Sequence, residues 1–142
     1  MSQQRITARG VLTHEGKIFT AKRAETKRYF PGIYELPGGW VEFGEHPETT
    51  VVREFKEECG LDVTIEGFVC SGSQILEADH LVEFYFFVRR QDPAQQPQIQ
   101  ECDHSEIRWW DQETFLHEWE VSHPDYLAIK KAFEILRQNS AL

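Results

Sequence analysis

The segment 39–61 constrains the fold of this chain more than any other part of it. It reads GWVEFGEHPETTVVREFKEECGL and contains both of the signals that delimit a helix. Pro47 suits the first helical position, where its missing N–H is not needed, and Gly60 suits the left-handed residue that ends a helix. We therefore predict a helix from about Pro47 to Cys59.

The predicted helix separates charge from apolar surface. Successive helical residues are about 100° apart, so Glu54, Glu57 and Glu58 fall within an arc of about 100°. The neighbouring arc is apolar and can face a core; it carries Val52, Phe55 and Cys59. Carboxylates this close repel one another unless a cation lies among them, and Arg53 offsets part of the repulsion. Their hard oxygens suit Mg²⁺ or Mn²⁺ better than zinc, so the segment predicts a divalent-cation site.

Seen alone, the run EFKEE has a simpler interpretation, because charge runs of this kind usually mark a solvated helix face. The complete 23-residue pattern argues against that interpretation. Gly39 is followed after five residues by Glu45, and after seven more by REFKEECGL. In this spacing the segment resembles the signature of the Nudix hydrolases, with every defining position filled. The segments AKR, ELPGG and SEIRWW extend the likeness to the small MutT-type members of that family.

The resemblance implies an α/β fold, namely an α/β/α sandwich around a mixed sheet. It also implies hydrolysis of a nucleoside diphosphate linked to a further group, X, with Mg²⁺ as the cofactor and Mn²⁺ as an alternative. By this likeness Gly39 contributes backbone near the metal. The same likeness makes three carboxylates the metal ligands: Glu54, Glu57 and Glu58.

Three further residues are interpreted through the resemblance. Glu45 is expected to support Arg53 and the geometry of the loop before the helix. His46 departs from the Ser or Thr of many members, which predicts a weaker helix cap. His123 stands where MutT-type proteins place a base-contacting residue, but it replaces the asparagine expected for recognising oxidised guanine. We therefore interpret His123 as a residue that leads into the last helix.

The general base is left open between two catalytic candidates, because members of the family differ in the residue that activates water. Glu54 is the candidate within the motif, and Glu106, just before IRWW, is the best one outside it, with Glu101 behind it. An ordinary exposed strand residue is an equally good interpretation of Glu106. Arg23 is expected by resemblance to contact the substrate phosphates, whereas Lys22 would point to the opposite face of the strand.

Outside the motif, hydrophobic patterning and turn signals predict extended segments. They lie at about residues 5–13, 17–22, 34–36, 40–42, 62–70, 80–89 and 105–110. Asp111 can cap a short helix, and a last helix runs from about Pro124 to Gln138, so that helices flank a mixed sheet. The apolar stripe of the last helix predicts packing on the sheet; it carries Tyr126, Ile129, Phe133 and Leu136. Of Trp109 and Trp110, one should point inward and the other outward.

Length and composition predict one globular domain over residues 1–142. There are 24 Asp and Glu against 15 Lys and Arg, and the formal charge of −9 disfavours nucleic acid and anionic membranes as partners. The expected partner is a small nucleotide, and a homodimer is compatible with the sequence.

Cys59, Cys70 and Cys102 lack CxxC spacing, so neither a disulfide framework nor a zinc site is expected. Without a secretory signal or a bilayer-spanning run, a cytoplasmic location is expected.

The sequence therefore predicts a Mg²⁺-dependent pyrophosphohydrolase, with nucleoside triphosphates cleaved to the monophosphate and diphosphate as the first hypothesis. The alternative substrates are a nucleotide sugar such as ADP-ribose and a dinucleoside polyphosphate. A further alternative is a nucleotide-sensing module without turnover. That alternative is disfavoured because the carboxylate set is complete and no DNA-binding domain is attached.

Overall fold

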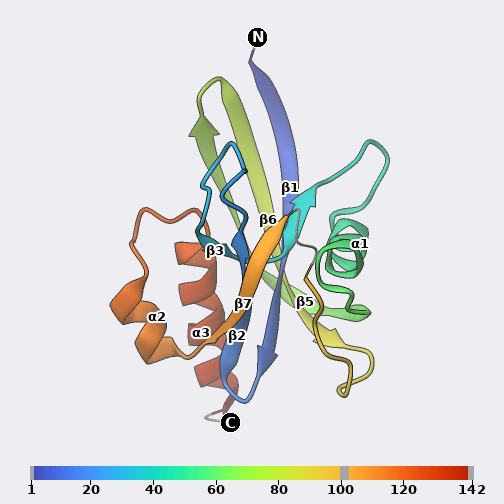
Figure 1. Ribbon diagram of the computed structural model, residues 1–142, viewed down its shortest axis with the longest axis vertical. Helices are drawn as coiled ribbons and strands as arrows, with labels where there is room; N and C mark the ends of the chain where they lie inside the picture. The colour runs from blue at the N-terminus through green and yellow to red at the C-terminus, as the bar shows by residue number, and fades with distance from the viewer. Residues whose placement is uncertain (1, 100–102, 141–142) are drawn as a thin grey trace.

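The computed structural model describes residues 2–99 and 103–140, and within them it has an α/β architecture of seven strands and three helices (Figure 1). The strands are β1 (Gln3–His14), β2 (Lys17–Arg23), β3 (Tyr34–Glu35), β4 (Gly38–Trp40), β5 (Val63–Leu76), β6 (Asp79–Arg90) and β7 (His104–Trp110). The helices are α1 (Pro47–Cys59), α2 (Gln112–Glu118) and α3 (Tyr126–Ser140). None of these helices is long and apolar enough to cross a membrane.

The strands form a mixed sheet, as predicted, with β1 at its centre. The order is β3-β2-β1-β6-β5, with β4 also paired to β1 and β7 to β2. Strand β1 runs parallel to β6 along residues 3–12, and the other five pairings in the described residues are antiparallel. Glu15 and Gly16, with φ of 50° and 76°, form the tight turn between β1 and β2. Positive φ at both positions matches the twist of a two-residue hairpin.

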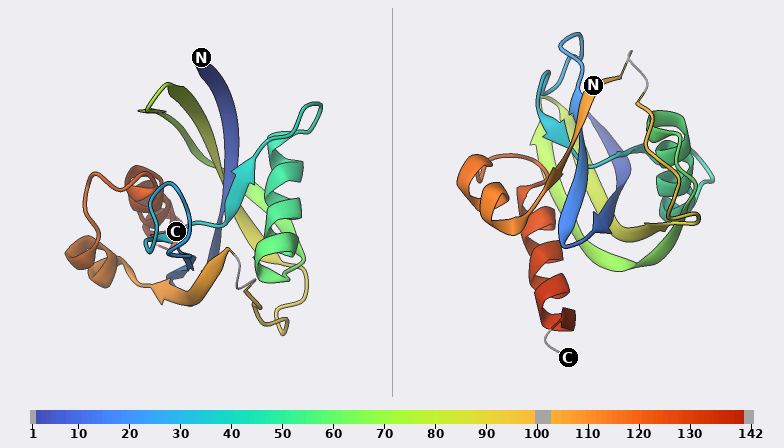
Figure 2. Two further views of the ribbon diagram at one scale, coloured as in Figure 1. Left: turned by 45° about the horizontal axis from the view of Figure 1, so that its top comes forward. Right: turned by 60° about the horizontal axis from the view of Figure 1, so that its bottom comes forward.

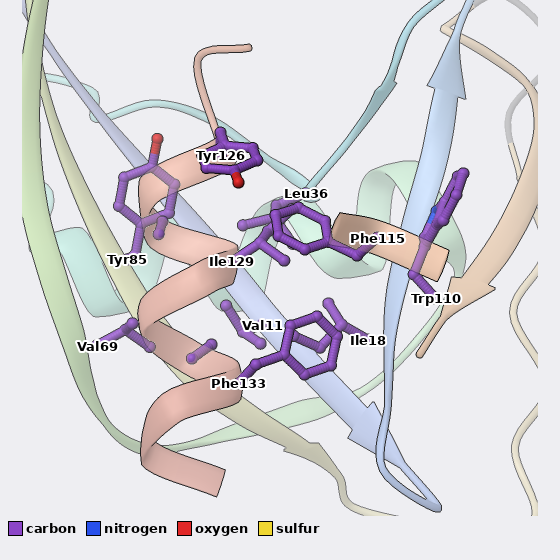
Figure 3. Close-up of a cluster of buried hydrophobic side chains, with 12 residues drawn as sticks. Val11, Ile18, Leu36, Val69, Tyr85, Trp110, Phe115, Tyr126, Ile129 and Phe133 are labelled. Atoms are coloured by element: carbon purple, nitrogen blue, oxygen red, sulfur yellow. The ribbon is translucent and has the colours of Figure 1, made fainter. Parts of the chain in front are cut away.

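Helix α1 covers one face of the sheet and α3 covers the other (Figures 1 and 2). A separate apolar cluster lies under each helix. The cluster under α1 includes Ala8, Leu12, Phe19, Val51, Phe55, Cys59, Leu61, Val63, Phe86 and Val88. The cluster under α3, drawn in Figure 3, includes Val11, Ile18, Leu36, Tyr85, Trp110, Phe115, Tyr126, Ile129 and Phe133. The expected sandwich of helices around a sheet is confirmed.

Helix α1 has the predicted bounds. Gly60 adopts the left-handed conformation with φ of 68°, and the His46 side chain makes no capping hydrogen bond, as predicted for both residues. The buried face is turned slightly from the predicted one, because Val51 is fully buried whereas Val52 is only partly so. This rotation depends on where β1 lies under the helix. The sequence of the helix alone does not contain that information.

The close approach of α1 to β1 depends on Gly10. A Cβ atom built at Gly10 would meet the ring of Phe55 and would lie 2.8 Å from a methyl carbon of Val51. Real Cβ contacts are essentially never shorter than 3.0 Å, so any larger residue would push the helix or its side chains away. The missing side chain at Gly10 therefore sets how near the carboxylates of α1 come to the sheet.

Both tryptophans of β7 face covered sides of the sheet. Trp110 is buried in the cluster under α3, and Trp109 is partly buried against the cluster under α1. The alternation of the strand is as predicted. The expectation that one ring would point outward is wrong, because Trp109 packs against Phe19, His14 and Arg90.

The hairpin of β5 and β6 is longer than predicted. Strand β5 continues to Leu76 and β6 begins at Asp79, whereas the predicted strand ends at residue 70. The added residues, SGSQIL, begin with four small or polar residues and are mostly exposed, so they lack the apolar alternation that marks a strand. Antiparallel pairing with β6 holds them instead.

The C-terminal half of the fold follows its predictions closely. Asp111 caps α2 by accepting a hydrogen bond from the Thr114 N–H at 2.7 Å. Helix α3 begins two residues after the predicted start at Pro124. Its predicted stripe packs in the core on the α3 side of the sheet, with Leu136 partly buried and three residues buried: Tyr126, Ile129 and Phe133. Among the cysteines, Cys59 and Cys70 are free thiols, and Cys102 lies outside the described residues.

Candidate active site

Glu45 and Arg53 join the loop before α1 to the helix itself. Arg53 Nε donates to Glu45 Oε2 at 2.8 Å, and Nη2 donates to Oε1 at 3.0 Å. Glu45 Oε1 also accepts hydrogen bonds from the Thr50 hydroxyl at 2.6 Å and from the Glu42 N–H at 3.2 Å. The hydrogen bonds from Arg53 are the main cause that lowers the pKa of Glu45 to about 2. This is the contact expected if Glu45 supports Arg53 and the loop.

Arg53 is the α1 cation that contacts the predicted metal ligands. Its Nη1 lies 3.0 Å from Glu54 Oε1 and 3.2 Å from Glu57 Oε2, and its Nη2 donates to the Trp40 carbonyl at 3.2 Å. The hydrogen bonds with Glu45 and the charge of Glu54 raise the pKa of Arg53 above its ordinary value. Arg53 therefore bridges the loop, β4 and two of the predicted metal ligands.

The glycines of β4 bring backbone against the carboxylates of α1. The Gly38 N–H donates to Glu58 Oε2 at 3.2 Å. A Cβ atom at Gly39 would lie 2.5 Å from Glu54 Oε1, so a side chain there would displace that carboxylate. The φ of Gly39 is not in the left-handed region, and the close approach alone explains the need for glycine. We call Gly39, Glu54 and Glu58 the carboxylate corner.

The negative charge of Glu54 and Glu58 in the carboxylate corner is only partly neutralised by the nearby arginines. Burial disfavours the ionised form and raises the pKa of both Glu54 and Glu58. The charges of Glu35 and Glu54 raise the pKa of Glu58 further, despite the opposing effect of Arg9. A divalent cation would reverse these shifts, because it favours the ionised carboxylates.

The donor chemistry of the corner fits Mg²⁺ or Mn²⁺. The available atoms are carboxylate oxygens and backbone beside a glycine, which are hard ligands. Glu57 is 58% exposed, and its Oε2 lies 3.2 Å from the same Arg53 Nη1 that contacts Glu54. In the conformation present, no group of three or more Asp, Glu, His or Cys side chains within residues 2–99 and 103–140 is arranged to hold a metal ion.

A buried ion network lies behind the corner and is centred on Glu35. Glu35 Oε2 lies 3.1 Å from Arg23 Nη1 and 3.7 Å from Arg9 Nη1, and Oε1 lies 3.2 Å from His104 Nε2. Burial acts to raise the pKa of Glu35, but the charge of Arg9 and the hydrogen bond with His104 outweigh it and leave the pKa below its ordinary value. Glu35 is thus a buried anion held by basic neighbours.

Asp125, just before α3, ties that helix to the segment leading into β4. Its Oδ2 accepts the Leu36 N–H at 3.0 Å, and its Oδ1 lies 3.0 Å from the Tyr85 hydroxyl. The same hydroxyl lies 3.0 Å from Glu83 Oε2. A hydroxyl has only one proton to donate. Both contacts are therefore hydrogen bonds when Glu83, whose pKa burial raises, carries a proton of its own.

A cavity of about 240 Å³ opens on the α3 face of β1 and β6. Trp40 and Glu35 line it, so it adjoins both β4 and the ion network. Its other polar walls include Thr7, Arg23, Gln74, Glu83 and His123. The Thr7 hydroxyl is buried and has no hydrogen-bond partner among the described residues. Buried polar groups are normally satisfied by protein or by ordered water, so this hydroxyl is available to a water or to a ligand group in the cavity.

Arg23 and Glu106 lie outside the carboxylate corner. Arg23 lines the cavity and is held by Glu35 and by the Tyr29 carbonyl at 2.9 Å. Lys22 is not among the cavity residues, and the strand register shifts between Lys22 and Arg23. Glu106 contacts Lys22 at 3.4 Å and the Tyr34 hydroxyl at 2.7 Å, not α1. The assigned roles stay predictions, and the further base candidate Glu101 lies outside the described residues.

Several polar residues of the buried network and of the cavity were not predicted from the sequence. They are Thr7, Arg9, Glu35, Glu83, Tyr85 and Asp125. One signal could have found some of them: polar residues at alternate positions within otherwise apolar strands, as in TARGVL and VEFYFF. Such residues face one side of the sheet. Only the tertiary structure reveals that a cavity rather than solvent lies on that side.

The sequence matches the family model of the NUDIX domain over residues 3–129, and the chain belongs to the Nudix family. Among curated relatives, an ADP-ribose pyrophosphatase of Methanocaldococcus jannaschii is 48% identical over 52 residues, which are 37% of this chain and 30% of that protein. An 8-oxo-dGTP diphosphatase of Proteus vulgaris is 39% identical over 59 residues, 42% of this chain and 52% of that protein. The matches thus span from under a third to about half of these relatives' lengths.

Solved structures agree on the fold. The MutT protein from Methanosarcina mazei superposes with a TM-score of 0.79 at 22% identity, covering 97% of this chain and 96% of that one. A MutT Nudix hydrolase from Burkholderia pseudomallei superposes with a TM-score of 0.76 at 23% identity, covering 92% and 98%. At these identities the likeness establishes the fold alone.

Proposed function

We propose that this chain is a Mg²⁺-dependent pyrophosphohydrolase that cleaves the diphosphate of a nucleoside diphosphate linked to X. The observation that carries the proposal is the carboxylate corner, where Glu54 and Glu58 lie against the glycines of β4 and Arg53 contacts Glu54. A bound divalent ion there supplies charge neutralisation to the diphosphate and acidity to a coordinated water. Mn²⁺ suits the same oxygen ligands and is the alternative.

The residues of the carboxylate corner and Glu57 have distinct proposed roles. Glu54, Glu57 and Glu58 would hold the ion together with the backbone of Gly39. For the general base we prefer Glu54, because a base must reach the attacking water and Glu54 lies in the corner itself. Glu106 is the weaker candidate of the two, since it is engaged by Lys22 and Tyr34 on β2 and β3.

We propose the cavity beside Trp40 as the site of the substrate's nucleoside, with a nucleoside triphosphate as the preferred substrate. The cavity adjoins β4 and contains hydrogen-bonding groups from Thr7, Gln74 and Glu83, which suit the polar edge of a base. Arg23 projects into the same cavity and would contact a phosphate or the sugar. The volume of this cavity, about 240 Å³, suits a single nucleoside.

Hydrolysis of ADP-ribose is the second candidate. The observation in its favour is the local identity of 48% to a protein named ADP-ribose pyrophosphatase, although the match covers only 30% of that protein. A dinucleoside polyphosphate is a further alternative substrate. A non-catalytic nucleotide sensor is less well supported, since all the motif carboxylates are present.

One screen separates these candidates. The purified chain would be incubated with Mg²⁺ and, in turn, nucleoside triphosphates, ADP-ribose and dinucleoside polyphosphates, and the products would be identified. Release of diphosphate and a monophosphate from a triphosphate supports the first candidate. Nucleotide binding without any product in Mg²⁺ or Mn²⁺ would contradict the enzymatic proposal and support a sensor.

The Glu58→Gln variant tests the ligand assignment. Gln keeps the size of the side chain and its acceptor for the Gly38 N–H, but it removes the charge that would hold the ion. We expect the Mg²⁺-dependent turnover to fall by at least about a hundredfold, as when charge-stabilising groups of an active site are removed, with an unchanged circular dichroism spectrum. Full activity of both this variant and Glu57→Gln would refute the ligand set.

A further inference from the structure

Two segments that are distant in sequence meet at the edge of the cavity. One is the loop 24–33 between β2 and β3, and the other is the tip of the β5–β6 hairpin (Figure 1). The loop contributes Tyr29 and Phe30 to the cavity wall, and the hairpin contributes Leu76 and Leu81. The cavity is therefore bounded on this side by the contact of two segments rather than by one rigid element.

A single carboxylate at the hairpin tip joins the two segments. Glu77 Oε2 lies 2.9 Å from Arg28 Nη2 and accepts a hydrogen bond from the Tyr29 hydroxyl at 3.2 Å. Glu77 has φ of 55°, a conformation that costs a residue with a side chain some stability. The carboxylate is thus held at a turn position where glycine or asparagine is the usual choice.

The contact is too exposed to be a main support of the fold. The Arg28 side chain is 74% exposed and that of Glu77 is 60% exposed. Exposed ion pairs of this kind contribute little to global stability. A contact of this strength breaks and reforms readily, and so it can restrain the loop without preventing a ligand from entering.

We propose that Arg28, Tyr29 and Glu77 form a latch that determines which substrates the cavity accepts. With the latch formed, Tyr29 and Phe30 stay against the hairpin and the cavity keeps its small volume. With the latch broken, the loop moves away, the nucleoside loses one wall, and larger ligands enter more easily. The proposal rests on the proposed function, which assigns the nucleoside to this cavity.

The charge-reversal variants Arg28→Glu and Glu77→Arg test the latch. Each replaces an attraction by a repulsion, and we expect the KM for the best nucleoside triphosphate to rise on the order of threefold to tenfold, with kcat within about twofold. Discrimination against ADP-ribose should weaken. The double variant, R28E/E77R, restores the ion pair with reversed polarity and should return the KM to within about twofold of the original value.

Asp62→Arg is the matched control. It makes the same change of charge as Glu77→Arg and breaks an exposed ion pair of similar length, that of Asp62 with Lys56 at 3.2 Å, away from the cavity. Its KM should be unchanged. An equal rise of the KM in Asp62→Arg, or no recovery in the double variant, would overturn the latch as a determinant of specificity.

Hydrogen exchange separates failure of the latch from failure of the proposed function. Without any substrate, amides in the loop 24–33 should exchange faster in Glu77→Arg than in the original chain, and not in Asp62→Arg. Unchanged exchange in Glu77→Arg would overturn the latch whatever the activity. If the original chain hydrolyses none of the substrates, the proposed function fails, and faster exchange would then support the loop restraint but refute its role in selecting substrates.

Discussion

At the scale of single residues, Glu45 links protonation to stability. Its folded-state pKa of about 2 lies below the value of about 4.3 that a Glu side chain has in an unfolded chain. The ionised carboxylate therefore stabilises the fold fully above about pH 4.3, and this contribution is lost as the pH falls through about 2. Stability falls as the pH is lowered because the Glu45 carboxylate binds a proton more tightly in the unfolded chain than in the folded one.

We expect Glu45→Gln to lower the free energy of unfolding at pH 6 by about 1–3 kcal/mol, the range for a hydrogen bond to a charged partner. The difference between the two proteins should shrink steadily as the pH is lowered from 5 toward 2. Urea denaturation at several pH values measures both quantities. A difference that is independent of pH would show that the charge of Glu45 has no part in the effect.

Gly39→Ala tests the carboxylate corner without removing a charge. The added methyl group would lie 2.5 Å from Glu54 Oε1, so the carboxylate must move away from the corner. We expect the apparent Mg²⁺ affinity in the turnover assay to fall on the order of tenfold to a hundredfold, as when a group that orients a metal ligand is lost. Gly67→Ala is the control, since its methyl group has nothing within 4 Å. Equal effects of both variants would contradict the assignment.

At the scale of elements, a single substitution at Gly10 tests the spacing between α1 and β1. Gly10→Ala inserts a methyl group between β1 and the side chains of Phe55 and Val51. We expect overpacking to lower the free energy of unfolding by about 1–3 kcal/mol. Gly72→Ala, whose methyl group meets no atom within 4 Å, controls for the change of a strand glycine. Chemical denaturation compares the two, and equal stabilities would show that the helix accommodates the methyl group without strain.

The elements differ in how far the sequence predicts them. Helix α1 was predictable to its end residues because Pro47 and Gly60 act locally. The extension of β5 beyond Cys70 was not, since partners on β6 rather than its own side chains hold it. In the candidate site, the contact of Glu45 with Arg53 was expected through the resemblance of the motif to the family signature. It did not predict that Glu35 is surrounded by basic residues from separate strands, because only the pairing of those strands brings them together.

At the scale of the whole molecule, the two apolar clusters share one sheet. Phe115 belongs to the cluster under α3 and Phe55 to the cluster under α1, and both are fully buried. Because β1 contributes Val11 to one cluster and Leu12 to the other, neither layer can lose its packing while the other keeps it.

We therefore expect one cooperative thermal transition, and we expect it to remain single in Phe115→Leu despite a loss of about 1–3 kcal/mol from the cavity created. Near-ultraviolet circular dichroism follows the packed aromatic rings of both clusters, and far-ultraviolet circular dichroism follows the backbone. The two melting curves should coincide. Separate midpoints would contradict a single cooperative transition.

The parallel pairing of β1 with β6 also has a consequence for how the chain reaches this fold. Residues 3–12 pair with residues of β6 between Asp79 and Val88, and β2 pairs with β7 still later in the chain. During synthesis β1 cannot pair with β6 until β6 has left the ribosome. Strand β1 therefore lacks its main partner for most of that time. Sheets built from such distant segments have high contact order and fold slowly, on the scale of about milliseconds to seconds. The N-terminal end of β1, QQR, is polar and exposed, which disfavours pairing of the unpaired strand with other chains.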